Sequence, residues 1–258
     1  MKFNNRNVFI SPSAQLGKNV RIGDDTVIYD NVIIGDNTTI CNNSVIGEPV
    51  NDYYEVASYI NPQTIIGNNC LIRSHAIIYA GSNLGNYFSS GHRITIRENS
   101  VVGEHCRVGT LADIQGNLQI GNYCWLHSNV FIPQYSTIHD FVFLYPHVIL
   151  TNDPHPPSII NKGPEIFPFA QIGAGSLIGP GVKIGPHALI GAGSNVMKNI
   201  DAYKLAFGNP AKEIKDVREI FSKQLNQNYY PWPYQFSRQM PWEDTGFDNW
   251  LEMHPEYN

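Results

Sequence analysis

The sequence predicts an all-β protein whose chain winds into a three-sided parallel β-helix of hexapeptide repeats. An aliphatic residue returns at every sixth position over 10–46, 60–150 and 166–196, and Ser90 is the one exception in the middle run. Four places after most of these aliphatics stands a small or β-branched residue, and Gly often follows the aliphatic directly, as in IGDN and IGAG. A period of six fits neither a helix nor a flat strand, but it is the period of a hexapeptide β-helix.

Each hexad is expected to form one short strand and one tight turn. The aliphatic and the small residue would point inward, while Gly, Asn and Asp would supply turns with a positive φ. Three hexads make one coil of 18 residues, and successive coils would stack about 4.8 Å apart through main-chain hydrogen bonds. Cys70, Cys106 and Cys124 are separated by multiples of 18, so they are expected to share one inward column.

Composition agrees with this fold class and excludes several functions. Only 15% of the residues are charged, and the chain holds 22 Gly and 17 Pro, which is typical of a turn-rich β protein. The net charge of −5 argues against a nucleic-acid partner. We find neither a signal-peptide pattern nor a long apolar run, so no membrane span is expected. The four cysteines form no CxxC pair, and we expect a reduced, cytoplasmic protein.

Two breaks in the period predict protruding loops. The step from Ile46 to Ile60 is 14 residues and that from Leu150 to Ile166 is 16, instead of 6. Loops of about eight and about ten extra residues would therefore leave the helix, the second carrying TNDPHPP. Excursions from a strict solenoid commonly carry function.

The repeat ends near residue 200, so we divide the chain into a β-helix over 1–200 and a C-terminal unit over 201–258. The segment 211–227 has apolar residues at helical spacing, which predicts an amphipathic helix. The tail after it is rich in Trp, Tyr and Pro. We expect this tail to be an extended strap that caps the open last coil; the alternative is that it reaches a neighbouring subunit or the substrate.

The three corners of the prism differ in their residues. Corner A comprises 79–81, 97–99, 115–117, 133–135 and 151–153; corner B comprises 85–87, 103–105 and 121–123; corner C comprises 73–75, 91–93, 109–111, 127–129 and 145–147. Corner B holds ordinary turn residues and is expected to have no special role. On corners A and C the turn residues are replaced by titratable ones, namely His75, His92, Arg93, Arg97, Glu98, His127 and His147. Small residues such as Gly91, Gly109 and Gly116 leave room beside them, as a polar ligand site requires.

The repeat, the TND loop and FGNPAKEI at 207–214 resemble the left-handed β-helix acyltransferases over residues 1–215. Within that superfamily, the stretches 78–110 and 150–157 are most similar to N-acyltransferases that modify dTDP-linked amino deoxysugars. The resemblance implies a CoA-dependent N-acyltransferase, with acetyl-CoA as the expected donor, a dTDP- or UDP-linked amino sugar as acceptor, and a role in O-antigen or S-layer glycan biosynthesis. It also implies a homotrimer with clefts between neighbouring prisms.

The resemblance further suggests roles for individual residues. The pantetheine arm of coenzyme A would lie along Gly173, Ala174, Gly191 and Ala192, with Lys198 and Lys212 at the cofactor phosphates. His127 is the first candidate for the base that takes the ammonium proton, since imidazole titrates near neutral pH. Glu98 and His92 are candidates for orienting groups or alternative bases. Arg93 and Arg97 would bind the nucleotide diphosphate, and Asn152 and His155 the sugar.

Other interpretations remain open at this stage. Some members of the family have no dedicated protein base and leave the proton to the thiolate or to water. FISPSAQLG and IIGEP also resemble the O-acyltransferases of the lipid A type, which use acyl carrier protein. The His-Asp stretch that this resemblance implies has its nearest match in Ile138-His139-Asp140, on corner B. A non-catalytic trimeric scaffold or a γ-carbonic-anhydrase-like metal enzyme are further alternatives. A zinc site needs three or four ligands around one ion, and the spacing of the histidines predicts no metal.

Overall fold

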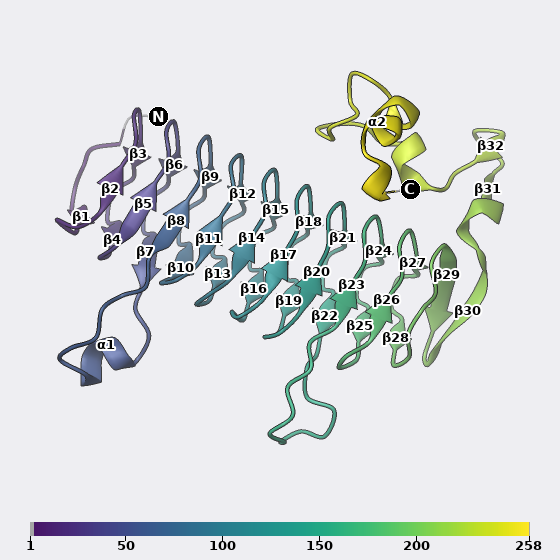
Figure 1. Ribbon diagram of the computed structural model, residues 1–258, viewed down its shortest axis with the longest axis horizontal. Coiled ribbons are helices and arrows are strands. Elements are labelled where there is room, and N and C mark those ends of the chain that lie inside the picture. Colours follow the sequence, from purple (N-terminus) through teal and green to yellow (C-terminus); the bar gives the residue numbers. More distant parts are fainter. Residues whose placement is uncertain (1–2, 258) are drawn as a thin grey trace.

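The computed structural model describes residues 3–257 and is a left-handed parallel β-helix with three long sheets as its sides (Figure 1). The predicted fold class is confirmed. The first sheet has ten strands: β1 (Phe9–Ile10), β4 (Val27–Ile28), β7 (Val45–Glu48), β10 (Ile77–Tyr79), β13 (Thr95–Ile96), β16 (Asp113–Ile114), β19 (Phe131–Ile132), β22 (Ile149–Leu150), β25 (Leu177–Ile178) and β28 (Asn195–Val196). The second has nine: β2 (Gln15–Leu16), β5 (Val32–Ile34), β8 (Thr64–Ile66), β11 (Asn83–Leu84), β14 (Val101–Val102), β17 (Gln119–Ile120), β20 (Thr137–Ile138), β23 (Glu165–Ile166) and β26 (Lys183–Ile184).

The third sheet has eleven strands and includes the last hairpin. Its strands are β3 (Arg21–Ile22), β6 (Thr39–Ile40), β9 (Leu71–Ile72), β12 (Ser89–Ser90), β15 (Arg107–Val108), β18 (Trp125–Leu126), β21 (Phe143–Leu144), β24 (Gln171–Ile172), β27 (Leu189–Ile190), β29 (Lys204–Gly208) and β30 (Ala211–Asp216). A separate two-stranded sheet pairs β31 (Phe221–Ser222) with β32 (Gln227–Asn228). The helical elements are α1 (Asp52–Glu55), η1 (Val217–Glu219), η2 (Trp232–Tyr234), α2 (Phe247–Met253) and η3 (Pro255–Tyr257). Among the described residues no helix is long and apolar enough to cross a membrane.

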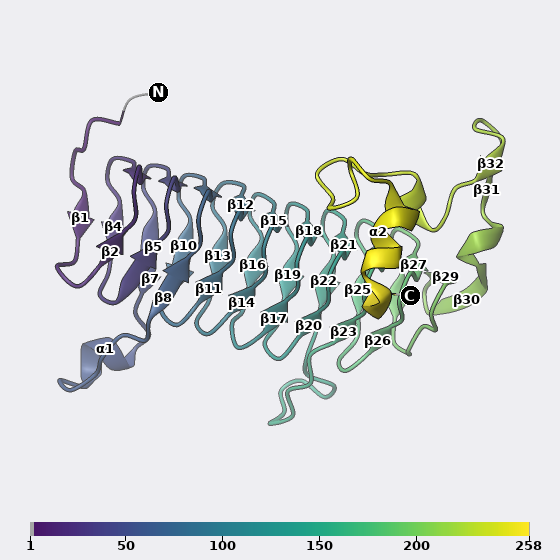
Figure 2. The ribbon, with the colours of Figure 1, turned by 45° about the horizontal axis from the view of Figure 1, so that its top comes forward.

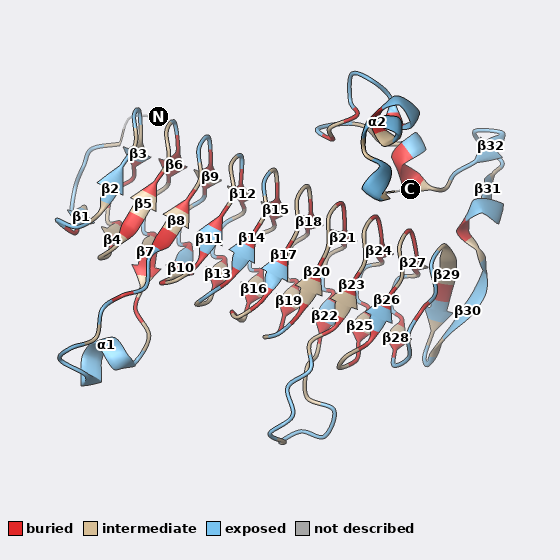
Figure 3. Ribbon diagram, viewed as in Figure 1, coloured by how far each residue is buried: buried red, intermediate tan, exposed pale blue. Residues whose placement is uncertain are grey.

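The register between coils is the predicted 18 residues, with Ile78 opposite Ile96 and Val108 opposite Leu126. The inward aliphatics form one continuous core, seen as the buried inner lining in Figure 3. The three cysteines of the predicted column are buried in it. Ser90 occupies an inward position too, and its hydroxyl accepts a hydrogen bond from the backbone N–H of Arg73 at 2.9 Å. A buried hydroxyl with a partner is tolerated where an aliphatic is missing.

Both predicted loops are present, and they leave the prism on the same side. The first runs from the end of β7 through α1 to β8, and the second runs between β22 and β23. Each follows a strand of the first sheet, so both start at corner A, and they hang from one edge of the column in Figure 1 and Figure 2.

The predicted helix over 211–227 is wrong. Most of its first half is strand β30, which pairs antiparallel with β29 and places Phe207 opposite Lys212. The hairpin turn has Gly208 at a φ of 110° and continues through Asn209 and Pro210. The edge of the last coil needs a hydrogen-bonding partner, and this requirement overrides the helical spacing of the apolar residues. Three of those residues, Ile214, Phe221 and Leu225, remain exposed.

The tail does not cap the last coil, which contradicts our expectation. The β29–β30 hairpin lies there instead, and the chain from residue 229 returns along the outside of the prism (Figure 2). There it forms a second hydrophobic cluster with the prism. The prism contributes Phe141, Phe143 and Phe169, and the tail contributes Trp232, Met240, Trp242, Phe247 and Trp250. The indole N–H of Trp232 donates to the carbonyl of Phe169 at 2.9 Å. The tail is therefore a packed unit on the side of the column.

Candidate functional site

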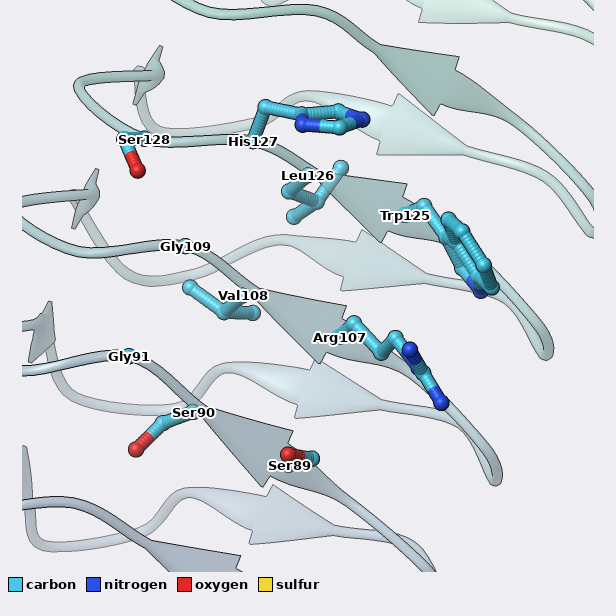
Figure 4. A pocket seen from close by; sticks show the side chains of 10 residues that line it. All are labelled: Ser89, Ser90, Gly91, Arg107, Val108, Gly109, Trp125, Leu126, His127 and Ser128. Carbon is cyan, nitrogen blue, oxygen red and sulfur yellow. The ribbon is translucent and has the colours of Figure 1, made fainter.

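A groove opens on the third sheet where its strands turn into corner C. The cavity measures about 260 Å³ and is shown in Figure 4. Its lining comes from three successive rungs: Ser89, Ser90, Gly91, Arg107, Val108, Gly109, Trp125, Leu126, His127 and Ser128. His127 stands at one end of it, and Arg107 and Trp125 form the opposite wall in Figure 4.

Stacking of the coils explains the bare rungs below His127. A Cβ on Gly109 would come within 2.4 Å of the backbone nitrogen of Ser128, and one on Gly91 within 2.3 Å of that of Thr110. Real Cβ atoms do not approach a backbone so closely, so a side chain at either position would need the next coil to shift, as it does where His127 and Tyr145 stand. Close stacking of the coils thus favours both glycines, and the open floor under His127 is its consequence.

The surroundings of His127 favour a neutral imidazole. Its ring stacks on Tyr145 with centroids 5.1 Å apart and planes 7° apart. The side chain is half-buried, and burial lowers its pKa. Among residues 3–257 no side chain donates a hydrogen bond to the ring or accepts one from it. A half-buried imidazole with its nitrogens unoccupied can accept a proton from a ligand.

Corner C continues above Tyr145 as two small rungs, 173–175 and 191–193. Gly173 is fixed by stacking, because a Cβ there would lie 2.5 Å from the backbone nitrogen of Ala192. Gly175 and Gly193 both have a φ of 69° and nothing within 4 Å of an added Cβ. The part of the edge above the Tyr145 rung is therefore free of large side chains.

The structure brings Lys198 and Lys212 to one place. Both line a cavity of about 320 Å³ beside the last coil, together with Met197, Asn199, Ile200, Pro210, Ala211 and Glu213. Lys198 follows β28 and Lys212 lies on β30, so the hairpin that replaced the predicted helix is what places the two ammonium groups at one cavity.

Corner A places Arg97 and Glu98 together and away from His127. The two side chains form a bidentate ion pair, with both N–O distances 3.0 Å. The guanidinium also lies 5.5 Å from the centroid of the Tyr79 ring. His92 and Arg93 are exposed on corner C. Within one chain, Glu98 is thus partnered by Arg97 and stands on a different edge from His127 and His92.

The remaining candidates lie at the second loop. The amide nitrogen of Asn152 donates to the carbonyl of Gln134 at 3.4 Å, and the Asn152 carbonyl accepts from the backbone of Lys162 at 2.7 Å. His155 is exposed, and its backbone N–H donates to Asp153 at 2.9 Å. Asn152 thus stands at the base of the loop on corner A, three rungs from Glu98, and His155 stands further out.

Sequence reasoning missed a feature of corner B, which does have a special role. Its third residues form a ladder of seven stacked rings along the prism: Tyr87, His105, Tyr123, Phe141, Phe169, His187 and Tyr203. Successive centroids lie 4.5 to 5.4 Å apart. The tail packs against the middle of this aromatic ladder. An aromatic residue or His every 18 residues is the signal that could have predicted it.

Two observations bear on the alternative functions. No three His, Cys, Asp or Glu side chains within 3–257 are grouped as a metal ion would require. The pair His139-Asp140, the nearest match to an O-acyltransferase pair, has structural partners on corner B. His139 bonds Glu165 at 3.2 Å, and Asp140 accepts from the backbone N–H of Asn122 at 2.6 Å and from the hydroxyl of Tyr257.

Comparison with known proteins supports the same fold. The family model described as bacterial transferase hexapeptide (six repeats) matches residues 6–48 and 157–198. A UDP-N-acetylglucosamine acyltransferase from Arabidopsis is similar with a TM-score of 0.61 and 16% identity, over 83% of this chain and 74% of that one. The enzyme of the same description from Campylobacter jejuni has a TM-score of 0.56 and 20% identity, over 85% and 78%.

A search among curated proteins finds no matching sequence. Because these two solved structures are only 16% and 20% identical to this chain, their similarity supports the fold but does not indicate the substrate. The chain therefore matches the bacterial transferase hexapeptide repeat over these two stretches and shares the left-handed β-helix fold with the two acyltransferases.

Proposed function

We propose that this protein is an acyl-CoA-dependent N-acyltransferase, with acetyl as the expected acyl group, that acts on the amine of a nucleotide-linked amino deoxysugar. One observation carries the proposal. A single edge of the prism holds a half-buried imidazole at His127, the Tyr145 ring stacked on it, and beyond Tyr145 two rungs without large side chains. A proton acceptor followed by a bare edge suits an amine acceptor and a slender pantetheine arm.

The chemistry follows from the state of His127. The attacking amine must be neutral, and the proton it loses on acylation needs an acceptor. Burial lowers the pKa of His127, which keeps the imidazole in its accepting form near neutral pH. In this proposal the amine nitrogen attacks the thioester carbon, the carbon–sulfur bond breaks, and coenzyme A leaves as the thiol while His127 moves the proton.

The donor would lie along the upper part of corner C. The rungs with Ala174 and Ala192 would contact the pantetheine arm through their backbone. Lys198 and Lys212, which line one cavity, would bind the phosphates of coenzyme A. Because Lys198 follows β28 of the first sheet and so lies on corner A, these two lysines would come from the neighbouring subunit. Acyl-CoA is a cytoplasmic donor, so the proposed site of action is the cytoplasm.

The second half of the site is proposed to come from a neighbouring subunit of a homotrimer. Glu98, Asn152 and His155 belong to corner A, whereas His127 belongs to corner C. A cleft between two prisms would bring one corner of each kind together. In such a cleft the Arg97–Glu98 pair would contact the sugar as a unit, because each group already holds the other.

O-acyl transfer from acyl carrier protein is the second candidate. The sequence resemblance raises it, and the two solved structures that share the fold are described as UDP-N-acetylglucosamine acyltransferases. The position of His139 and Asp140 argues against it, since the pair lies on corner B, outside the groove of His127, and Asp140 is engaged by Asn122 and Tyr257.

One assay separates the two. The protein is incubated with acetyl-CoA and a panel of dTDP- and UDP-linked amino sugars, and free thiol is followed with time. A parallel arm supplies acyl carrier protein loaded with acyl chains and UDP-N-acetylglucosamine. Thiol release that depends on an amino sugar supports the proposal; turnover only in the second arm supports O-acylation and contradicts the proposal.

A further inference from the structure

The outer face of the first sheet is apolar over most of its length. Strand pairing stacks the outward side chains of its ten strands into one column, for example Ile77 opposite Thr95 and Ile149 opposite Leu177. The column starts with Phe9, Val27, Val45 and Ile77. After Thr95 and Asp113 it continues with Phe131, Ile149 and Leu177 and ends at Asn195. Phe9, Ile77 and Ile149 are 54%, 36% and 42% exposed, so the column is open to solvent in the single chain.

The other two faces of the prism differ from this one. On the third sheet, the outward rings of Trp125 and Phe143 pack against the tail. On the second sheet, the outward column is polar after Ile65, with Val101 as the exception. Within residues 3–257 no strand of the first sheet belongs to the tail cluster. The chain thus covers one apolar face with its own tail and leaves the other uncovered, as at a protein interaction site.

The charge of this face suits a second copy of the same chain. Asp113 is the one charged residue among the ten of the column, and its carboxylate accepts a hydrogen bond from the side-chain amide of Gln115 at 2.8 Å. A face that meets its own copy must not bring many like charges together. The column also has no Lys or Arg that would attract an anionic membrane surface.

The face is large enough for a stable contact. Ten strands that stack about 4.8 Å apart make it about 43 Å long. A width of about 15 Å, or roughly four to five extended residues, gives an area on the order of 650 Å². A standard interface buries about 800 Å² on each partner, and the two flanking corners would add to the contact.

One edge of this face carries further exposed apolar residues. The first sheet lies between corner C, which precedes each of its strands, and corner A, which follows it. Both loops leave the prism at corner A (Figure 1, Figure 2), and they expose Ile60, Ile159 and Ile160. A second chain that packs against the face and its corner A edge would cover both sets of apolar side chains.

The two corners explain why the partner is a copy of this chain. His127 lies on corner C, whereas Glu98 and Asn152 lie on corner A. In a closed ring whose copies turn the first sheet toward a common axis, every copy presents its two corners in the same rotational order. Corner C of one copy then lies beside corner A of the next, which completes the site.

We propose that the outer face of the first sheet is the surface by which copies of this chain assemble into a closed ring. The number of three copies and the completed site rest on the proposed function, whereas the choice of face rests on the exposed apolar column. Ile77 and Ile149 would be buried in this contact, and the tail, which packs on the third sheet, would stay on the outside of the ring.

The mass of the assembly in solution tests the choice of face. Light scattering on the full wild-type chain is expected to give three times the 28.9 kDa of one chain. Ile77→Asp and Ile149→Asp would each place a carboxylate in the contact and should weaken assembly by at least about tenfold, so that smaller species appear on dilution. Val101→Asp is the matched control, since Val101 is outward on β14 of the second sheet and 47% exposed; it should keep the wild-type mass. A monomeric wild type, an assembly unchanged in both first-sheet variants, or an equal loss in Val101→Asp would overturn the proposal.

Circular dichroism checks that each variant keeps its β structure. Ile77 and Ile149 are exposed in the single chain, so the coil should tolerate both changes. Should an aspartate unfold the coil, Ile77→Ser and Ile149→Ser combined in one chain give the same test, because they remove apolar contact area without adding a charge.

Activity then links the contact face to the site. Ile149 does not line the groove of His127, yet Ile149→Asp should lose turnover in step with the loss of assembly, because corners A and C no longer meet. Val101→Asp should turn over normally. A fully active monomer would overturn the proposal. A wild type that assembles through this face but acylates no amino sugar contradicts the proposed function and leaves the contact face standing.

Discussion

Corners B and C are built on the same turn but have become different surfaces. The third residue of each rung has a positive φ on both, for example 56° at His105 on corner B and 63° at His147 on corner C. On corner B these residues are mostly aromatic, and their rings stack into a ladder that the tail partly covers. On corner C the first residues of the rungs that line the groove are Gly91, Gly109 and His127, and the groove remains open.

The difference shows how the coil spacing selects a role for an edge. Coils repeat about every 4.8 Å, which is close to the distance between offset-stacked aromatic rings. Any aromatic residue repeated every 18 positions therefore stacks on its neighbours and makes a packing edge. An edge of glycine and alanine has nothing to stack and leaves backbone accessible to a ligand.

Removing one ring of the covered ladder should have the largest effect. Phe141 is buried and contacts Trp242 and Trp250 of the tail. We expect Phe141→Ala to lower the free energy of unfolding of the tail unit by about 3–5 kcal/mol, as for other buried Phe to Ala changes. Denaturant unfolding followed by tryptophan fluorescence measures this, because all four tryptophans lie at the junction of tail and prism.

The matched control lies at the uncovered end of the same ladder. Tyr87 stacks on His105 but is 52% exposed and outside the tail cluster. Tyr87→Ala should cost less than about 1 kcal/mol. Equal losses in the two variants would mean that the tail does not depend on the ladder for its place.

The opposite behaviour is expected on corner C, where a change should affect activity and leave the fold intact. His127→Ala should lower turnover by about 10²- to 10⁴-fold, the usual contribution of a general base, with unfolding changed by less than about 1 kcal/mol. In the wild type, activity should fall as the pH drops through the lowered pKa of His127, because the protonated ring cannot accept a proton. His147→Asn on the same corner serves as the control and should turn over normally. Unchanged turnover in His127→Ala would remove it as the base.

The coil itself could be predicted from the sequence because its signal is local and repeated. The aliphatics and the positive-φ turns recur every six residues, and the cysteines recur at multiples of eighteen. Every coil therefore gives the same evidence for the fold as the coil before it. The hairpin of β29 and β30 could not be predicted in the same way, because it forms by pairing with the exposed edge of the last coil. The sequence of residues 204–216 does not reveal this edge, which is known only from the folded prism.

The candidate site was predicted less well, for a physical reason. Stacking by 18 correctly places His127 below the bare rungs, because both are on corner C. It does not show that Arg97 is held by Glu98, nor that Lys198 and Lys212 meet at one cavity. It also does not show Arg107 at the groove wall, because its neighbour Gln239 is 132 residues away and comes from the tail.

A buried histidine in the ladder gives a pH test of the packing edge. Burial, and to a lesser degree Arg218, lower the pKa of His187 to about 4, against about 6.5 in the unfolded chain. The native state therefore resists protonation of His187. The stability that depends on a neutral His187 is complete above pH 6.5 and is lost as the pH falls toward 4. The loss amounts to about 3 kcal/mol. His187→Phe keeps a ring between Phe169 and Tyr203 and should lose correspondingly less between pH 7 and pH 4. Equal losses would contradict burial as the cause.

The smallest expected effect tests whether the bare edge of corner C serves a ligand. Gly175 has a φ of 69° with nothing within 4 Å of an added Cβ, and Asn adopts this conformation more easily than other residues. Gly175→Asn should change the free energy of unfolding by less than about 1 kcal/mol while raising the KM for acyl-CoA about fivefold, since its side chain would lie along the proposed path of the pantetheine arm. If this variant keeps the wild-type KM, the glycines of corner C serve the turn alone, and the two corners differ in packing but not in function.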